Sequence, residues 1–89
     1  MKNIQHPGKV VFICDGKKCS NYSRIIRREF KEAIRENGLK NDVAIVRMDC
    51  TDNCKCAPVI CLQPRNIWIG EVTEYAVPAL VEEFLMKDN

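Results

Sequence analysis

Cysteine is the residue type in this sequence most able to do chemistry, with six in 89 residues. Four of the six form two closely spaced pairs, Cys14 with Cys19 (C-x₄-C) and Cys50 with Cys54 (C-x₃-C). Cysteine thiolates ligate zinc and iron–sulfur clusters, and they also exchange disulfides. Two pairs far apart in the chain can therefore form one four-thiolate site if the fold brings them together.

The compartment decides whether such cysteines pair with each other or stay reduced. Residues 1–10 contain neither the apolar stretch nor the small-residue cleavage site of a signal peptide, which predicts a cytoplasmic protein. Reducing conditions there favour metal ligands or redox groups over structural disulfides. No stretch of the sequence approaches the length of a membrane span, so no membrane association is expected.

Chain length and net charge indicate the number of domains and argue against one class of partner. A chain of 89 residues predicts one domain covering residues 1–89, and so short a domain often needs a metal or a disulfide to stabilise it. The formal charge of +2, from 14 basic and 12 acidic residues, is too small to indicate a nucleic-acid partner. No aromatic residues interleave with the basic ones either, which argues against single-stranded nucleic acid.

The hydrophobic pattern predicts an α/β fold. Residues 9–14 form a continuous apolar run typical of a buried strand, and a helical pattern follows from residue 19 or 20 until Asn37-Gly38 ends it. Three further strands are expected at 42–48, 57–62 and 67–69, the last two as an antiparallel hairpin. A closing helix over 77–85 has Thr73 as a candidate cap and Pro78 in its first turn. The order is βαβββα, a mixed four-stranded sheet with two helices.

This order brings the two cysteine pairs together. The first two strands and the helix between them form a β-α-β unit, so the strands are expected to be parallel and their carboxyl ends to share one edge of the sheet. Cys14 closes the first strand, Cys19 opens the helix, and Cys50 and Cys54 follow the second strand. The sequence therefore predicts a site at that edge, where open α/β sheets place their ligands. Spacing alone does not choose between an iron–sulfur cluster and a Cys₄ zinc site.

Two stretches of sequence carry a resemblance to a known family. Residues 50–59 read CTDNCKCAPV and residues 68–73 read WIGEVT. Together they resemble the thioredoxin-like [2Fe–2S] ferredoxins and the related cluster-bearing small subunits of NADH dehydrogenases and hydrogenases. The resemblance runs from about Val10 to about Leu85. Its most specific part is C-x₃-C-x-A-P-V, and C-x₄-C at Cys14 also fits.

The resemblance implies a thioredoxin-like fold and one [2Fe–2S] cluster ligated by Cys14, Cys19, Cys50 and Cys54. It implies a one-electron carrier that works with redox partner proteins and is not an enzyme in its own right. Family members are often homodimers, so a homodimer is implied as well. The sequence lacks the N-terminal helical extension of the larger subunits, which favours a stand-alone carrier.

The two remaining cysteines are not required by the motif. Cys61 alternates within a predicted strand, which indicates a small buried side chain. Cys56 follows Cys54 by two residues and could serve as a substitute ligand. A redox motif C-x-x-C is absent, which argues against thiol–disulfide exchange.

The alternative function is a zinc-stabilised interaction module, in which a structural Cys₄ site only holds the loops. A basic stripe on the predicted helix, Arg24, Arg28, Lys31 and Arg35, would then bind the partner. In the electron-carrier interpretation the same stripe either docks an acidic redox partner or is simply solvated. The sequence leaves both interpretations of the stripe open.

Overall fold

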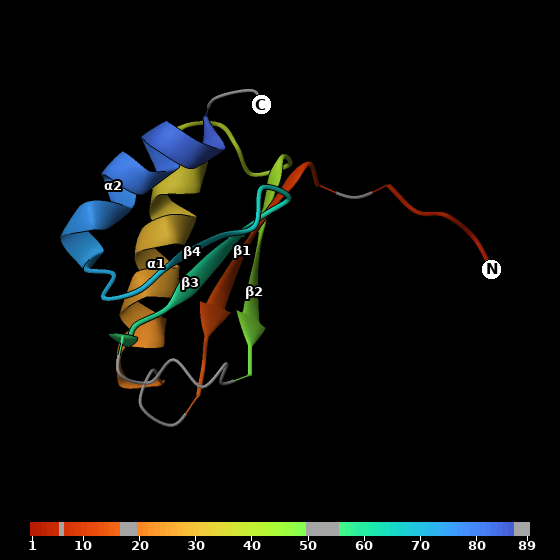
Figure 1. Ribbon diagram of the computed structural model, residues 1–89. Helices are drawn as coiled ribbons and strands as arrows, with labels where there is room; N and C mark the ends of the chain where they lie inside the picture. The colour runs from red at the N-terminus through yellow and green to blue at the C-terminus, as the bar shows by residue number, and fades with distance from the viewer. Residues whose placement is uncertain (6, 17–19, 50–55, 87–89) are drawn as a thin grey trace.

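The order of elements agrees with the predicted βαβββα pattern (Figure 1). The computed structural model describes residues 1–5, 7–16, 20–49 and 56–86. The elements in order are β1 (Lys9–Cys14), α1 (Ser20–Glu36), β2 (Val43–Met48), β3 (Ile60–Gln63), β4 (Ile67–Ile69), the 3₁₀ turn η2 (Glu74–Ala76), α2 (Val77–Leu80) and the π-helical turn η3 (Val81–Leu85). Among these described segments, no helix has the length and apolar character to cross a membrane.

The four strands form one mixed sheet in the order β2-β1-β3-β4. β1 and β2 are parallel, and Cys14 at the end of β1 lies opposite Met48 at the end of β2. β3 is antiparallel to both β1 and β4. The predicted parallel pair and hairpin are thus confirmed, and β1 and β2 end at the same edge of the sheet.

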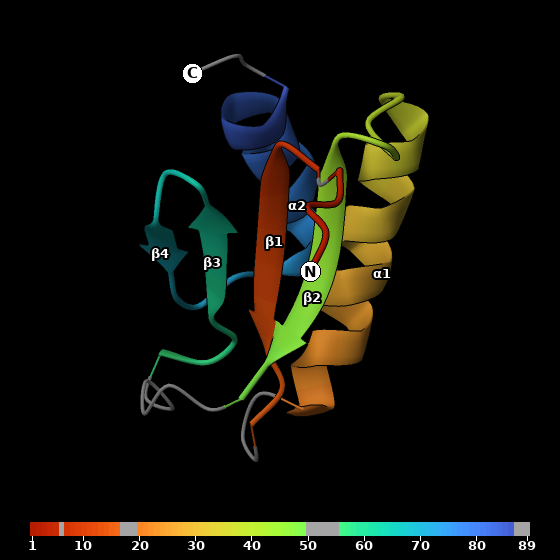
Figure 2. The same cartoon turned by 90° about the vertical axis from the view of Figure 1, so that its right-hand side faces the viewer.

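Both helical segments cover one face of this sheet (Figures 1 and 2). Side chains alternate along a strand, and Val11 and Ile13 of β1 with Ile60 and Leu62 of β3 are buried against the helical segments. The largest fully buried side chains of this core are Phe30, Ile13, Ile60, Leu85, Val11, Val77 and Val81. Burying one such side chain contributes roughly 1.5–3 kcal/mol, so this layer supplies most of the stabilisation of the fold.

α1 ends as its sequence predicts. Gly38 adopts a left-handed conformation, with φ of 68°, which a residue without a Cβ adopts at little cost. The Leu39 N–H then donates to the Ile34 carbonyl at 2.9 Å, and the Asn37 side chain donates to the Ala33 carbonyl at 2.7 Å. Two carbonyls in the last turns of α1 are thereby satisfied.

Apolar residues repeat along α1 at helical spacing from Tyr22 to Ile34, but only part of this stripe packs in the core. Phe30 and its neighbours pack in the core, but Tyr22 and Ile25 in the first turns are exposed. They line an open groove of about 460 Å³ together with Pro58 and the segment 71–75. Helical spacing indicated the correct stripe, but it could not indicate that the first turns of α1 face a groove.

The third strand begins later than predicted. The sequence pattern placed its start at Ala57, whereas β3 begins at Ile60. The preceding residues make other backbone contacts: the Val59 carbonyl accepts from the Cys14 N–H at 3.0 Å, and the Pro58 carbonyl accepts from the Val72 N–H at 3.1 Å. The stretch before β3 therefore joins β1 to the chain that leads into the closing helix.

The predicted cap, Thr73, caps the 3₁₀ turn η2 that leads into the closing helix, whereas α2 itself begins after Ala76 without a side-chain cap. The Thr73 side chain accepts a hydrogen bond from the Ala76 N–H at 3.3 Å, and Pro78 lies in the first turn of α2. The helix is less regular than predicted, because it begins as the 3₁₀ turn η2 and ends as the π-helical turn η3.

Candidate metal centre

Cys14 lies at the sheet edge where the sequence predicts a site. It is the last residue of β1, and its side chain is 2% exposed. It packs with Val59, and Met48 and Ala57 lie against the same small apolar cluster. Its N–H donates to the Val59 carbonyl, and the next residue, Asp15, donates to the Met48 carbonyl at 2.9 Å. Three chain segments thus hold Cys14 in position from both sides.

The other three predicted ligands, Cys19, Cys50 and Cys54, lie outside the described residues. Within the ranges that the structure describes, no group of three or more His, Cys, Asp or Glu side chains could hold a metal ion. Of the four predicted ligands, the structure therefore tests the placement of Cys14 alone.

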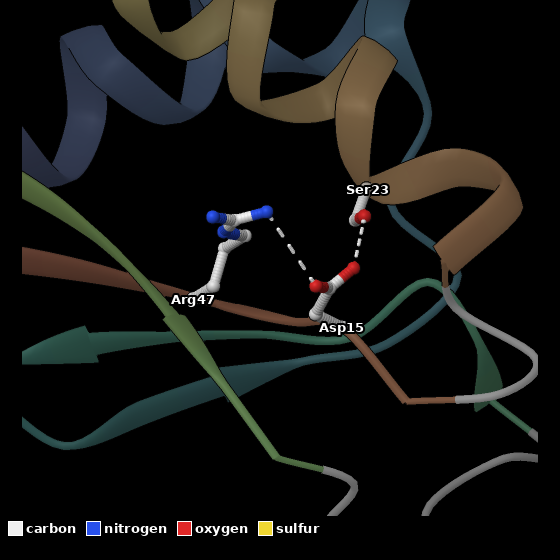
Figure 3. A network of polar contacts seen from close by, with 3 residues as sticks. All are labelled: Asp15, Ser23 and Arg47. Atoms are coloured by element: carbon white, nitrogen blue, oxygen red, sulfur yellow. Dashed lines mark hydrogen bonds and ion pairs between the residues drawn. The ribbon is translucent and has the colours of Figure 1, made fainter.

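A polar network braces the same edge (Figure 3). The Ser23 hydroxyl, in the second turn of α1, donates to one carboxylate oxygen of Asp15 at 2.8 Å. Arg47 of β2 forms an ion pair of 3.8 Å with the other oxygen. Both side chains of that pair are partly exposed, so the ion pair contributes at most about 1 kcal/mol. The network links the carboxyl ends of β1 and β2 to the beginning of α1.

A close backbone contact fixes the described end of the second cysteine segment. The Glu71 N–H donates to the Cys56 carbonyl at 2.6 Å. A Cβ placed on Gly70 would come within 2.6 Å of the Cys56 Cβ and 2.9 Å of the Cys56 carbonyl oxygen. Only glycine allows this approach without a shift of the neighbouring chain. The Cys56 side chain itself is exposed.

Gly70 is thus a positioning residue that sequence reasoning missed. It stood in the sequence only as part of the WIGEVT stretch, after a strand and before a helix cap. A glycine at such a place indicates a close approach of some kind, but the partner is 14 residues away in the chain and no local pattern identifies it.

Cys61 has a different environment, within β3. It is 2% exposed and lies opposite Phe12, two residues before Cys14 along β1. The Gln63 side chain donates to its sulfur at 3.2 Å, and the sulfur lies 3.9 Å from the Asn66 side-chain oxygen. The predicted burial of Cys61 is confirmed, and its hydrogen bonds to the hairpin are an addition.

Asn66 is the centre of this polar cluster in the β3–β4 turn. Its side-chain oxygen also accepts hydrogen bonds from the Gln63 amide at 2.9 Å and from the Trp68 indole N–H at 2.8 Å. Its φ of 59° is left-handed, which asparagine tolerates better than most residues. Trp68 belongs to the hairpin as predicted, but it is half exposed.

The named proteins to which this chain is similar are 2Fe-2S ferredoxins. No family model matches the chain. A protein of Priestia megaterium named "Putative 2Fe-2S ferredoxin" is 32% identical over 83 residues, covering 84% of this chain and 59% of that protein. The chain thus spans about three-fifths of the length of this curated relative.

Solved structures extend the similarity to nearly the whole of both chains. The wild-type thioredoxin-like [2Fe-2S] ferredoxin from Aquifex aeolicus superposes with a TM-score of 0.79 and 27% identity, over 89% of this chain and 86% of that one. A second structure of a thioredoxin-like [2Fe-2S] ferredoxin from the same organism gives 0.80 and 27%, over 90% and 82%. The thioredoxin-like fold predicted from the sequence is confirmed.

Proposed function

Since the chain is related to the thioredoxin-like [2Fe–2S] ferredoxins, we propose that it is a one-electron carrier with a single [2Fe–2S] cluster. The proposed ligands are Cys14, Cys19, Cys50 and Cys54. The chain covers only part of its curated relative, so the activity of the whole protein belongs to this proposal.

The observation that carries the proposal is the path of the chain around Cys14. β1 and β2 end side by side, with Cys14 opposite Met48. The chain leaves β2 at this edge and returns at Val59, whose carbonyl accepts a hydrogen bond from the Cys14 N–H. Met48 and Val59, described residues on either side of the stretch that contains Cys50 and Cys54, therefore both lie beside Cys14. The segment with Cys19 also leaves from this edge, since it joins Cys14 to α1.

The surroundings of Cys14 suit a thiolate ligand of a cluster. Four cysteines are the donor set that such a cluster takes, and soft thiolates bind iron well. The bound cluster would accept one electron and release it again. The Cys14 N–H donates to the Val59 carbonyl and the neighbouring Asp15 N–H donates to the Met48 carbonyl, while Val59, Met48 and Ala57 belong to the apolar cluster in which Cys14 is buried. Burial and hydrogen bonding around the sulfurs are the means by which a protein tunes a reduction potential.

A carrier of this kind exchanges electrons with redox partner proteins and turns over no substrate. The cytoplasmic location, the homodimer and the single domain over residues 1–89 remain predictions from the sequence. They do not affect the site, whose proposed ligands all belong to one chain.

The first experiment is metal analysis with visible spectroscopy. Protein purified without oxygen from iron-replete cells is expected to contain about two irons and two acid-labile sulfides per chain, with a red-brown spectrum that bleaches on adding dithionite. Zinc in place of iron, in colourless protein, would refute the carrier and support the zinc-stabilised module.

Serine variants test the ligand set directly. Replacing Cys50 or Cys54 with serine is expected to remove most of the visible absorption or to change its shape, because a hydroxyl is a poorer ligand for iron than a thiolate. Cys56→Ser is the matched control, because Cys56 lies on the same segment and is not a proposed ligand. An unchanged spectrum for both Cys50→Ser and Cys54→Ser would refute the assignment.

A further inference from the structure

The charges of α1 are sorted onto two sides of the helix. The basic residues Arg24, Arg28, Lys31 and Arg35 follow one another at helical spacing and so share one side. The acidic residues Glu29 and Glu36 lie on the side toward α2 and η3, where they line one groove with Glu82, and Glu32 lines both this groove and the groove on the basic side. The small net charge of the chain therefore conceals a strongly basic side next to an acidic one.

A groove between α1 and β2 lies on the basic side. Its volume is about 570 Å³, and its rim carries the cations Arg28, Lys31, Arg35 and Lys40. Of the residues that the structure describes, Glu32 is the only carboxylate that lines it. β2 is an outer strand of the sheet and α1 runs beside it (Figure 2). The groove, lined by residues of both elements, therefore lies at an edge of the sheet.

The floor of this groove is apolar. Ile34 of α1 and Val43 of β2 are buried beneath the rim, and Ile45 of β2 is partly buried beside them. Cations around an apolar floor form a surface that can accept an aliphatic side chain and bind carboxylates around it.

The basic side continues to the edge that holds Cys14. A second groove, of about 170 Å³, is lined there by Arg24, Arg27 and Arg47 with Asp15 and Ser23. The Asp15 carboxylate is already bound by Ser23 and Arg47 (Figure 3).

The other cations of the basic side are not ion-paired within the described part of the chain. Among the described residues, no carboxylate forms an ion pair with any of six cations on this side: Arg24, Arg27, Arg28, Lys31, Arg35 and Lys40. Glu32 and Asp15 are the carboxylates that line the two grooves in the described part of the chain, so the cations outnumber them and repel one another, and an acidic surface bound over the cations would relieve that repulsion.

We propose that this basic side is the docking surface for an acidic protein. It extends over both grooves, from Lys40 in the larger one to Arg47 in the smaller one. The complementary face carries several carboxylates around an aliphatic side chain, which enters the groove over Val43. The inference rests on the proposed function in one respect, since it makes the acidic protein the redox partner of the carrier. Arg24, Arg27 and Arg47 then hold that partner next to Cys14, where an electron would cross.

Nucleic acid fits this surface less well. Single strands are bound by cations together with aromatic side chains on which bases stack. The exposed aromatic residues Tyr22, Trp68 and Tyr75 do not line either basic groove. Charge complementarity with a protein also accelerates encounter, which a transient electron-transfer complex requires.

The test uses a fluorescein-labelled peptide of about 20 residues, mostly Glu with Leu at every fourth position, as the acidic probe. Its affinity is read by fluorescence anisotropy at roughly 50 mM and 500 mM salt. The variant Lys31→Gln/Arg35→Gln is expected to weaken binding about fivefold at low salt, and the difference should largely vanish at high salt.

The matched control is Lys2→Gln/Arg65→Gln, which lowers the net charge by the same amount away from the groove. It is expected to change the affinity less than about twofold. Equal weakening by the two variants would overturn the proposal, because bulk charge would then explain the binding. Tighter binding of a 20-nucleotide thymidine strand than of the acidic peptide would overturn it in favour of nucleic acid.

Two further readouts separate this proposal from the function on which it rests. Amide chemical-shift changes in the unaltered protein are expected to concentrate on the second half of α1 and on β2, and changes confined to other elements would refute the surface without any variant. Iron content is measured on every sample. Protein with its cluster but without peptide binding overturns the docking surface alone, and peptide binding without iron overturns the carrier alone.

Discussion

Cys14 and Cys61 are equally buried, at 2% exposure each, yet their positions in the sheet and their polar contacts differ. Cys61 lies within β3, where Gln63 donates to its sulfur. Cys14 lies at the end of β1, and its sulfur hydrogen-bonds no described residue. Burial alone therefore does not distinguish a structural thiol from the proposed ligand. The position at a strand end and the lack of a described polar partner are the distinguishing features.

The largest predicted effect separates these two cysteines. Cys14→Ser is expected to abolish most of the visible absorption of the purified protein, because one of four proposed ligands is lost. Cys61→Ser is expected to retain the spectrum and to lose only about 1 kcal/mol of unfolding free energy, since Gln63 can donate to the new hydroxyl. Visible spectra and urea unfolding measure the two quantities.

The opposite result would break the comparison. If Cys61→Ser lost the cluster while Cys14→Ser retained it, the ligand would lie inside the hairpin and the proposed edge would be wrong. Equal losses in both variants would show that the spectrum reports general destabilisation.

A second prediction concerns the contact that holds the segment after Cys54. Gly70→Ala would place a Cβ against Cys56, so the two chain segments must move apart. We expect a loss of about 1–3 kcal/mol in unfolding free energy and faster release of iron to a chelator. Gly8→Ala is the control, because a Cβ there meets nothing within 4 Å. Unchanged iron release in Gly70→Ala would show that this contact does not support the metal centre.

The smallest predicted effect is electrostatic. Asp15→Asn removes a negative charge beside Cys14, which favours the reduced cluster because that form carries one more electron. The midpoint potential is expected to rise by about 20–40 mV, equivalent to roughly 0.5–1 kcal/mol for one electron. Asp42→Asn is the matched control, because it removes the same charge at the other end of β2. The midpoint potentials of the two variants are measured by redox titration followed at visible wavelengths. Equal shifts of the potential in both variants would show that only net charge matters.

The sequence predicted most of the fold because its local patterns agree with the tertiary structure. The apolar run of β1 and the helical spacing of α1 gave correct elements, and Gly38 marked the end of α1 correctly. The start of β3 was placed too early, since backbone contacts of Pro58 and Val59 with distant segments replace sheet pairing there. Such contacts depend on the folded arrangement and leave no periodic signal.

The candidate site was predicted to a smaller extent. Topology placed Cys14 at the correct edge, because parallel strands joined by a helix must end together. The choice of iron over zinc came from the family resemblance, which depends on the motif around Cys54 and not on spacing. Gly70 was missed because its partner is distant in sequence, and the bracing of Asp15 by Ser23 and Arg47 was missed for the same reason.

Trp68, whose indole N–H donates a hydrogen bond to Asn66, is an intrinsic fluorescent probe of the hairpin. Trp68 is the only tryptophan in the chain, and its half-exposed indole lies in the hairpin that also contains Cys61. Its fluorescence emission therefore reports on the β3–β4 turn, whereas visible absorption would report on the proposed cluster. Heating one sample while recording both signals would reveal whether the edge at Cys14 opens before the hairpin melts or together with it.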